Sequence, residues 1–356
     1  MKQCKLCLLP SKAPGADIDS EGICSFCKTT IDHNKARLAD DQARTERSTK
    51  LEQIFNEHRG KNSYDALVCL SGGKDSLYLL YQLKVKYKLN ILAFTTDVNI
   101  PEVAWSNILR TIKKLDIDHL VYRPSSTFYQ KLFRYLLMNQ EERGAVYTVS
   151  YVYAPLFEGD ALTVATEKGI PLVLAGYSPG QPEPSRMEFE FSRSLITQTD
   201  WTPPALRQSG QFSEGELSRF WNPKHFPAGT QFPRYIAPFH AWDYDQESMI
   251  RVVHELGLVK RRAHGNPIHS NYPINWLLMY SDLKHFGYNP YAPEFSALIR
   301  QGKANRLYWR FMTPIVNSMI KYKLLLGRNT TLQMRWLGLS DSDLRITQPY
   351  GAYDPK

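Results

Sequence analysis

The stretch Ser71-Gly72-Gly73-Lys74-Asp75-Ser76 decides the fold, because it lies between an apolar run at 66–70 and a helical pattern at 77–87. Gly72 and Gly73 can adopt positive φ angles and bring bare backbone N–H groups close to an anion. The following helix adds its positive N-terminal end, and Lys74 adds a mobile charge. The six residues therefore predict a phosphate-binding turn rather than an ordinary strand-to-helix connection.

The spacing of the loop excludes the Walker A type of phosphate loop, which needs four residues between its first glycine and a Gly-Lys pair. Here only Gly72 precedes the pair Gly73-Lys74. The hexamer instead resembles the signature of the PP-loop ATP pyrophosphatases, which it matches without a substitution. That resemblance implies an enzyme that cleaves ATP between its α and β phosphates, leaves AMP on a substrate oxygen and releases pyrophosphate.

The same resemblance implies a role for each residue of the loop. Lys74 would neutralise the charge that builds on the leaving pyrophosphate. Asp75 would cap the helix or hold Mg²⁺ through water. We therefore predict Lys74 and Asp75 as catalytic residues. The β and γ phosphates of ATP would be cradled by Ser71, Gly72, Gly73 and Ser76.

The pattern around the loop alternates between strands and helices. Strands are expected at 66–70, 90–95, 119–122 and 171–175, and helices at 77–87, 102–115, 127–137 and 153–168. Such alternation predicts a doubly wound parallel sheet with ligands at the carboxyl ends of its strands. Asp97 follows the second strand, and Gly176 and Gln181 follow the fourth. These three residues are therefore candidate ATP contacts.

The chain divides along its length into four predicted parts. Residues 1–30 form a zinc-binding module and 31–62 a helical connector. Residues 63–240 form the α/β domain, with a long loop insertion at 178–232 that is rich in Pro, Ser, Gly and Gln. Residues 241–356 form a helical, basic C-terminal region.

Length and composition are those of a globular enzyme. The chain has 356 residues, 43% of them hydrophobic, which is enough for one large domain or two ordinary ones. Its first residues contain no apolar signal segment, and no stretch reaches the roughly 18 uninterrupted apolar residues of a spanning helix. A cytoplasmic location is the expectation.

Four of the five cysteines follow the spacing of a metal site. Cys4 and Cys7 form one Cys-x2-Cys pair, and Cys24 and Cys27 form another. Two disulfides are the alternative, which is disfavoured in a chain without a secretion signal. We therefore predict a structural zinc site with four thiolate ligands, which leaves no coordination position for activating water.

The remaining cysteine and the histidines carry weaker signals. Cys69 lies in the strand before the loop, where a small apolar side chain packs into the sheet. We expect a packing role for it rather than catalysis. The histidines show no metal-ligand spacing, and the polar stretches at 264–267 and 270–272 contain the best catalytic candidate, His264.

The positive charge is concentrated near the C-terminus. The chain has 44 Lys and Arg against 35 Asp and Glu, which gives a net charge of +9. Residues 295–340 contain no acidic residue, and the stretch 311–326 mixes apolar residues with lysines. The interpretations are a solvated helix face, a site for a nucleotide-sugar, a nucleic-acid contact, or an amphipathic helix at an anionic membrane surface. The eight basic residues are Arg300, Lys303, Arg306, Arg310, Lys321, Lys323, Arg328 and Arg335.

A second, longer resemblance covers most of the chain in order. The cysteine pairs, the loop, the stretch Asn107-Ile108-Leu109 and the stretch 296–303 with Arg306 resemble the N-acetyl sugar amidotransferase family of surface-polysaccharide biosynthesis. One departure is that this family tends to place Gly-Glu after the fourth strand, whereas Tyr177 follows Gly176 here. The resemblance implies an ATP-dependent amidotransferase. It also assigns Arg300 and Arg306 to substrate binding.

The resemblance further implies that ATP activates the oxygen of a sugar acetamido group, and that ammonia from a partner glutaminase subunit displaces the activated oxygen. The alternative is a PP-loop sulfurtransferase, or an enzyme that modifies tRNA or a heterocycle with an external sulfur donor. A third interpretation, a nucleic-acid adaptor without enzymatic activity, leaves the complete hexamer unexplained.

Overall fold

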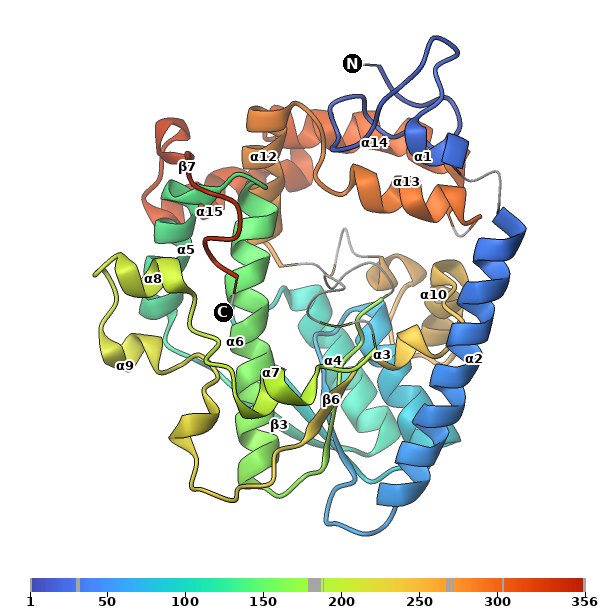
Figure 1. Ribbon diagram of the computed structural model, residues 1–356, viewed down its shortest axis with the longest axis vertical. Coiled ribbons are helices and arrows are strands. Elements are labelled where there is room, and N and C mark those ends of the chain that lie inside the picture. The colour runs from blue at the N-terminus through green and yellow to red at the C-terminus, as the bar shows by residue number, and fades with distance from the viewer. Residues whose placement is uncertain are drawn as a thin grey trace. The chain divides into compact units, whose positions relative to one another are not determined.

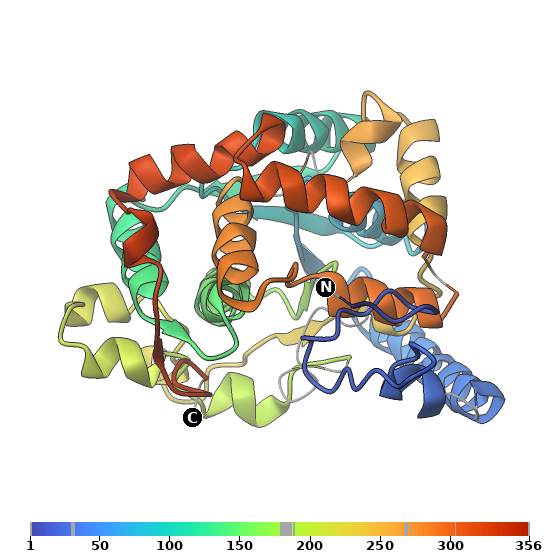
Figure 2. The same ribbon diagram turned by 90° about the horizontal axis from the view of Figure 1, so that it is seen from above.

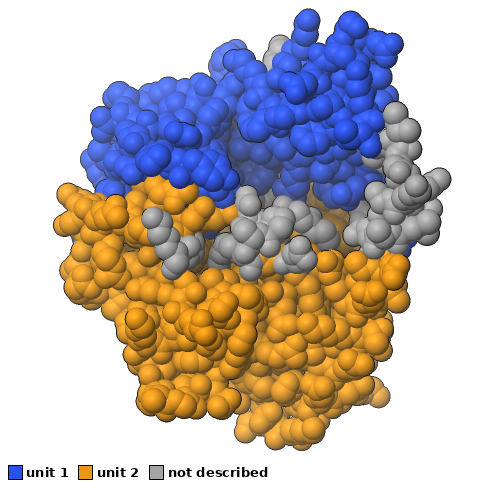
Figure 3. All heavy atoms as spheres, in the orientation of Figure 1, with its two compact units in different colours: residues 1–41, 130–150, 273–350 blue, residues 42–129, 151–272, 351–356 orange. Residues whose placement is uncertain are grey.

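The computed structural model describes residues 2–29, 33–178, 187, 189–266, 270, 272–302 and 304–354. The chain forms two compact units, coloured in Figure 3, which are each assembled from separate segments. Unit 1 comprises 1–41, 130–150 and 273–350, and unit 2 comprises 42–129, 151–272 and 351–356. This division follows spatial contacts, and the four predicted parts along the chain stay a prediction.

Unit 2 is built on a five-stranded parallel sheet with the strand order β3-β2-β1-β5-β6 (Figure 1). Its strand order reverses at β1, because β2 and β3 extend from one side of β1 whereas β5 and β6 extend from the other. The predicted parallel sheet is confirmed, and β6 is an addition to it. The strands are β1 (Ala66–Cys69), β2 (Ile91–Thr96), β3 (Asp118–Tyr122), β5 (Leu172–Leu174) and β6 (Arg234–Ile236).

Helices cover both faces of this sheet, as a doubly wound fold requires. Side chains alternate between the two faces along each strand, so Ala66 and Val68 pack in one apolar cluster and Leu67 packs in the other. The first cluster includes residues of α2 (His33–His58), α3 (Lys74–Tyr81), α4 (Glu102–Leu115) and α10 (Gln246–Glu255). The second includes residues of α6 (Ala145–Glu167).

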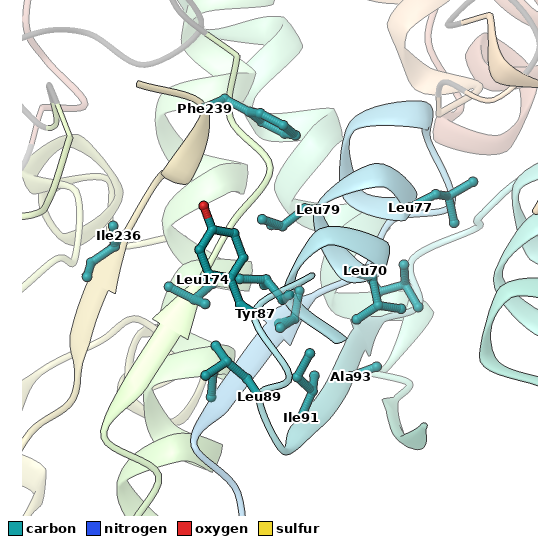
Figure 4. Packing of buried hydrophobic residues seen from close by; sticks show 14 of the residues in the cluster. Leu70, Leu77, Leu79, Tyr87, Leu89, Ile91, Ala93, Leu174, Ile236 and Phe239 are labelled. Carbon is teal, nitrogen blue, oxygen red and sulfur yellow. The ribbon is translucent and has the colours of Figure 1, made fainter. Parts of the chain in front are cut away.

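Figure 4 shows the first of these clusters around the strand residues Ile91, Ala93 and Leu174. Leu70 and Leu77, which flank the phosphate-binding loop, are both part of it. Burying one such aliphatic side chain contributes roughly 1.5 to 3 kcal/mol relative to leaving it exposed. The loop is therefore anchored at both ends by the core.

The segment predicted as a long loop insertion has more structure than its composition suggests. Within its described residues Trp201 and Trp221 are buried. The indole N–H of Trp201 donates to Leu195 O and that of Trp221 to Ile196 O, both at 2.9 Å. Aromatic packing thus holds the short helices of this segment together. The short helices are α7 (Arg193–Thr197), α8 (Pro204–Gln208) and α9 (Glu214–Leu217), with a 3-10 turn at Pro223–His225.

Unit 1 combines the cysteine module with C-terminal helices (Figure 2). Asp282 caps the first turn of α6, because its carboxylate accepts hydrogen bonds from the backbone N–H groups of Ala145 and Val146. A two-stranded parallel sheet joins β4 (Gln140–Glu141) to β7 (Ile346–Gln348). The helices are α1 (Ser25–Lys28), α12 (Ile274–Phe286), α13 (Ala292–Arg300), α14 (Arg306–Lys321) and α15 (Arg328–Leu337).

Helices α2, α5 (Ser126–Met138) and α6 run through both units. In the part of the chain that the structure describes, every helix is too short or too polar to cross a membrane. The remaining elements are a π-helical turn at Gln82–Lys86 and 3-10 turns at Pro238–His240, Arg262–Gly265, Leu325–Gly327 and Asp341–Asp343.

Candidate active site and metal centre

The loop 71–76 leaves the carboxyl end of β1, at the strand where the order of the sheet reverses. Doubly wound folds bind ligands at this position. Gly72 has a φ angle of +78°, and a Cβ atom there would lie 2.4 Å from the carbonyl oxygen of Ala104 on α4. Glycine is therefore required at residue 72 both by conformation and by space.

Hydrogen bonds within the loop hold its two serines together. Ser76 Oγ donates to Gly73 O at 3.1 Å and accepts from the backbone N–H of Ser71 at 3.2 Å. Asn107 Nδ2 donates to Gly72 O and to His264 O, each at 3.1 Å. The loop is thus fixed from inside and from α4, and the candidate His264 takes part through its backbone.

The loop ends in the N-terminus of α3, which no side chain caps among the described residues. Its N-cap is Gly73, which has no side chain to offer. The N–H groups of the first helical turn have no partner within the helix, and they carry a partial positive charge. This end of α3 therefore presents donors to an anion, as the sequence predicted for a phosphate site.

Lys74, which is buried, and the half-buried Asp75 form an ion pair at the start of α3. Lys74 Nζ lies 2.7 Å from Asp75 Oδ2, and Tyr244 OH donates to Asp75 Oδ1 at 2.9 Å. Lys74 Nζ also lies 5.9 Å from the centroid of the Tyr244 ring. Asp75 therefore restrains the one cation of the loop. The sequence did not predict this role of Tyr244, because Tyr244 lies in a region without a recognisable motif.

Asp97 lies at the carboxyl end of β2, where it organises the backbone. Arg123 Nε donates to Asp97 Oδ2 at 2.7 Å, and the backbone N–H of Ile100 donates to Oδ1 at 3.3 Å. The carboxylate is buried. These contacts give Asp97 a structural role, and its contact with ATP stays a prediction.

Gly176 packs directly on the start of α3. A Cβ atom at residue 176 would lie 3.1 Å from the backbone nitrogen of Ser76. The structure thus brings together the loop and one of the two predicted contacts that follow β5. The other, Gln181, lies outside the described residues.

Two carboxyl groups of α6, which sequence reasoning missed, lie near the strand ends. Thr96 Oγ1 donates to Asp160 Oδ2 at 3.1 Å, and burial raises the pKa of Asp160 to about 7. Tyr177 OH donates to Glu158 Oε1 at 2.7 Å. Glu158 thus brings an acidic group next to Tyr177. Tyr177 stands where the sugar amidotransferase family tends to have a glutamate. Neither carboxyl belongs to a motif, so only the fold reveals them.

The sulfur atoms of Cys4, Cys7, Cys24 and Cys27 lie within 4.8 Å of one another in unit 1. Cys4 and Cys27 are 3.7 Å apart and Cys7 and Cys24 3.6 Å, whereas a disulfide bond measures about 2.05 Å. Four thiolates around one tetrahedral ion with bonds of about 2.3 Å would be about 3.8 Å apart. The donor set therefore fits a single metal ion. A four-iron cluster would spread its ligands farther, because each thiolate binds a different iron.

The predicted substrate residues Arg300 and Arg306 contact this cysteine module. Arg300 Nη1 lies 3.4 Å from Cys7 Sγ and its guanidinium 5.2 Å from the ring centroid of Phe26, while Arg306 donates to Lys5 O. A guanidinium beside a thiolate offsets the negative charge of a four-thiolate site. The two arginines therefore brace the cysteine module, and their role in substrate binding stays a prediction.

The last cysteine, Cys69, lies outside the four-cysteine cluster, at the end of β1. Cys69 packs against the second core cluster, and its sulfur lies 3.8 Å from Tyr235 OH. Burial raises the pKa of the Cys69 thiol to about 12. A thiol with such a pKa is protonated at neutral pH and is a poor nucleophile.

Comparison with known proteins gives a limited match. No protein-family model matches the chain. A curated protein from Methanocaldococcus jannaschii, named "Probable sulfurtransferase", is 35% identical over 88 residues. The match covers 21% of this chain and 26% of that protein, so the chain spans about a quarter of the relative's length.

Three solved structures are similar at a TM-score of 0.35 and 13 to 14% identity. The U34-tRNA thiolase NcsA from Methanococcus maripaludis, with its [4Fe-4S] cluster, is covered to 89% and covers 95% of this chain. The similarity to NMN synthetase from Francisella tularensis covers 97% of that protein and 85% of this chain. The similarity to NH3-dependent NAD synthetase from Campylobacter jejuni covers 96% of that protein and 82% of this chain. Likenesses of this strength say nothing about the function of this chain. The parallel sheet with the loop 71–76 at its switch point defines a doubly wound α/β domain, a class of fold that binds its ligands at this position.

Proposed function

We propose that the protein is an ATP-dependent, AMP-forming enzyme of the PP-loop type. The observation that carries this proposal is the unsubstituted loop 71–76, which ends in an uncapped helix N-terminus at the switch point of a parallel sheet. Backbone donors there suit a polyphosphate group. In the proposed reaction, an acceptor oxygen attacks the α phosphorus of ATP, and the bond to the β phosphate breaks to release pyrophosphate.

The residues of the loop divide this work. Gly72 and Gly73 give the β and γ phosphates access to backbone N–H groups, and Ser71 and Ser76 shape the turn. Lys74 exchanges its contact with Asp75 for the leaving pyrophosphate and offsets its negative charge. Asp75, held by Tyr244, is then available to Mg²⁺ or to its water ligands.

The second half-reaction needs a nucleophile from outside the chain. Four cysteines are grouped in the metal site, and the Cys69 thiol is protonated at neutral pH. We propose sulfur transfer from an external donor as the first candidate, supported by the named sulfurtransferase. Sulfide would add to the activated carbon of the acceptor, and AMP would leave with the former acceptor oxygen.

Ammonia is the second candidate nucleophile, and the sequence resemblance to the sugar amidotransferases favours it. In that reaction a glutaminase subunit would supply ammonia, and a sugar amide would be the acceptor. The chemistry at the loop is the same for both candidates, because each displaces AMP from an activated carbon. The acceptor and the donor therefore define the function beyond the adenylation step.

We further propose that the four-thiolate site holds zinc in a structural role. All four positions around a tetrahedral ion would be occupied by sulfur, so none remains for water or substrate. The site lies among Leu9, Ala13 and Ala16, which make only a small apolar cluster. A metal ion would stabilise a module with so little core of its own.

The experiment is a product analysis with ATP, a panel of nucleotide-sugars, heterocycles and tRNA, and either sulfide or ammonia. Mass spectrometry should find AMP, pyrophosphate and an acceptor in which oxygen is replaced by sulfur or nitrogen. Lys74→Ala should abolish AMP formation, whereas Lys168→Ala, at an exposed lysine of unit 2, should leave it unchanged. Formation of ADP and phosphate instead would overturn the assignment.

A further inference from the structure

An exposed apolar stripe runs along α14 in unit 1. Leu307 and Phe311 are 60% and 68% exposed, and they follow one another at the spacing of one helical turn. Ile315 continues the same face. Large side chains at such spacing normally point into a core, so this helix presents outward the kind of face that most helices bury.

The opposite face of α14 is already used. Ile320 is buried, Trp309 stacks on Phe295 at 3.6 Å between ring centroids, and Asn317 accepts from Asn289 at 3.2 Å. Figures 1 and 2 show α14 beside α12 and α13, from orange to orange-red. Helix α14 is therefore anchored on unit 1 by one side, while its apolar stripe remains open to solvent.

The turn after α14 extends this surface. Leu325 is 73% exposed and has a φ angle of +49°, a left-handed conformation that is costly for a leucine. Close contact fixes the turn, because a Cβ atom at Gly327 would lie 2.0 Å from Met319 O. Strained, exposed apolar residues of this kind are typical of functional surfaces. The other exposed apolar residues around the turn are Tyr322, Leu324 and, on α15, Leu332.

Basic residues border the stripe. On the helix, Arg310 and Lys321 lie along one edge of it. In the described part of the chain neither they nor the exposed Arg328 forms a salt bridge, whereas Lys323 reaches Asp341 at 3.6 Å. Residues 295–340 contain no Asp or Glu. The surface thus combines an apolar centre with uncompensated positive charge.

We propose that α14 and the turn 322–325 dock on an anionic lipid surface. The apolar stripe would enter the headgroup region while the basic residues contact acidic headgroups, as in interfacial amphipathic helices. A second copy of the chain is disfavoured, because two such basic surfaces repel each other. A nucleic acid offers phosphates to the basic edge but no apolar phase for Leu307, Phe311 and Leu325. The proposal is independent of the proposed enzymatic reaction.

The test is flotation of the full-length, metal-loaded protein with vesicles of phosphatidylcholine alone or mixed with phosphatidylglycerol. We expect binding to the mixed vesicles only, weakened by salt. Phe311→Ser with Leu325→Ser, and separately Arg310→Gln with Lys321→Gln, should each lower the partition coefficient roughly tenfold. The matched controls are Leu109→Ser, at an apolar residue of α4 that is 61% exposed, and Arg110→Gln with Lys113→Gln.

Circular dichroism and metal content establish that each variant is folded. Equal binding to neutral vesicles, or unchanged binding by both double variants, overturns the proposal. The proposal is also overturned if the wild-type protein does not bind vesicles and instead forms a dimer in analytical ultracentrifugation that depends on Phe311. Binding of a labelled RNA, in a mobility-shift assay, that depends on Phe311 in the absence of vesicle binding would overturn it as well.

Discussion

Gly176 and Ser76 are so close that any side chain at residue 176 would crowd the backbone of Ser76. A Cβ atom on Gly176 would lie 3.1 Å from the backbone nitrogen of Ser76 and 3.2 Å from the carbonyl carbon of Asp75. The contact joins the segment after β5 to the first turn of α3. The conformation of the loop therefore depends on a neighbouring strand as well as on its own glycines.

Gly176→Ala should impair ATP use without unfolding the protein. The added methyl group meets backbone atoms, which cannot rotate away, so the start of α3 must shift. A shift of a fraction of an ångström in a phosphate site is expected to lower AMP formation at least roughly tenfold. Steady-state kinetics measure AMP formation, and a thermal melt measures stability.

Gly215→Ala is the control, because no atom would lie within 4 Å of a methyl group at residue 215. Equal activity of the two variants would show that the contact is unimportant.

The four-thiolate site predicts a defined response to loss of one ligand. Cys24→Ser should release the metal, because a serine hydroxyl is a poor substitute for a thiolate. Elemental analysis should find about one zinc and no iron per wild-type chain, and less zinc in the variant. Proteolysis should then cut first within residues 2–29. Iron and sulfide in stoichiometric amounts would replace the zinc assignment with a cluster.

Cys69→Ala tests whether the chain itself carries sulfur. We expect the variant to keep most of its turnover with saturating sulfide or ammonia, because burial raises the pKa of the Cys69 thiol to about 12. The loss of stability should be on the order of 1 kcal/mol, since a small side chain in a packed strand is shortened. A folded, metal-loaded variant that binds ATP but has no turnover would instead make Cys69 the sulfur carrier.

Sequence alone was sufficient to predict most of the strands and helices that surround the proposed ATP site. It predicted β1, β2, β3 and β5 to within about two residues and gave the bounds of α4 as observed, because apolar runs and the loop mark them clearly. It missed β6, three residues whose pairing with β5 is decided by tertiary contacts. It also began α3 at 77, whereas the helix starts at Lys74 inside the loop.

The buried carboxyls were missed for a related reason. The sequence predicted a helix at 153–168, but α6 starts at Ala145 and continues through Pro155. The first N–H groups of α6 donate hydrogen bonds to the carboxylate of Asp282, a residue distant in sequence. Nothing local signals that cap, or that Glu158 becomes buried. Such features depend on what packs against a helix, which a single segment does not reveal.

Asp160 predicts how stability changes with pH. Burial raises the pKa of its carboxyl from 3.8 to about 7, so the folded protein holds this proton more tightly than the unfolded chain. The resulting stabilisation is complete below about pH 4 and is lost as the pH rises through 7. Between pH 6 and 9 the wild type should lose about 1.4 kcal/mol of unfolding free energy from this group.

Asp160→Asn should remove this part of the pH dependence, because the amide is neutral and its oxygen still accepts from Thr96 Oγ1. Urea denaturation at pH 6, 7.5 and 9 measures the slope for wild type and variant. The control is Asp116→Asn, at an exposed residue that ends α4 and lies outside the core. If wild type and Asp160→Asn lose stability equally between pH 6 and 9, the Asp160 carboxyl is already ionised in the folded protein, and its place beside Thr96 is more hydrated than the structure indicates.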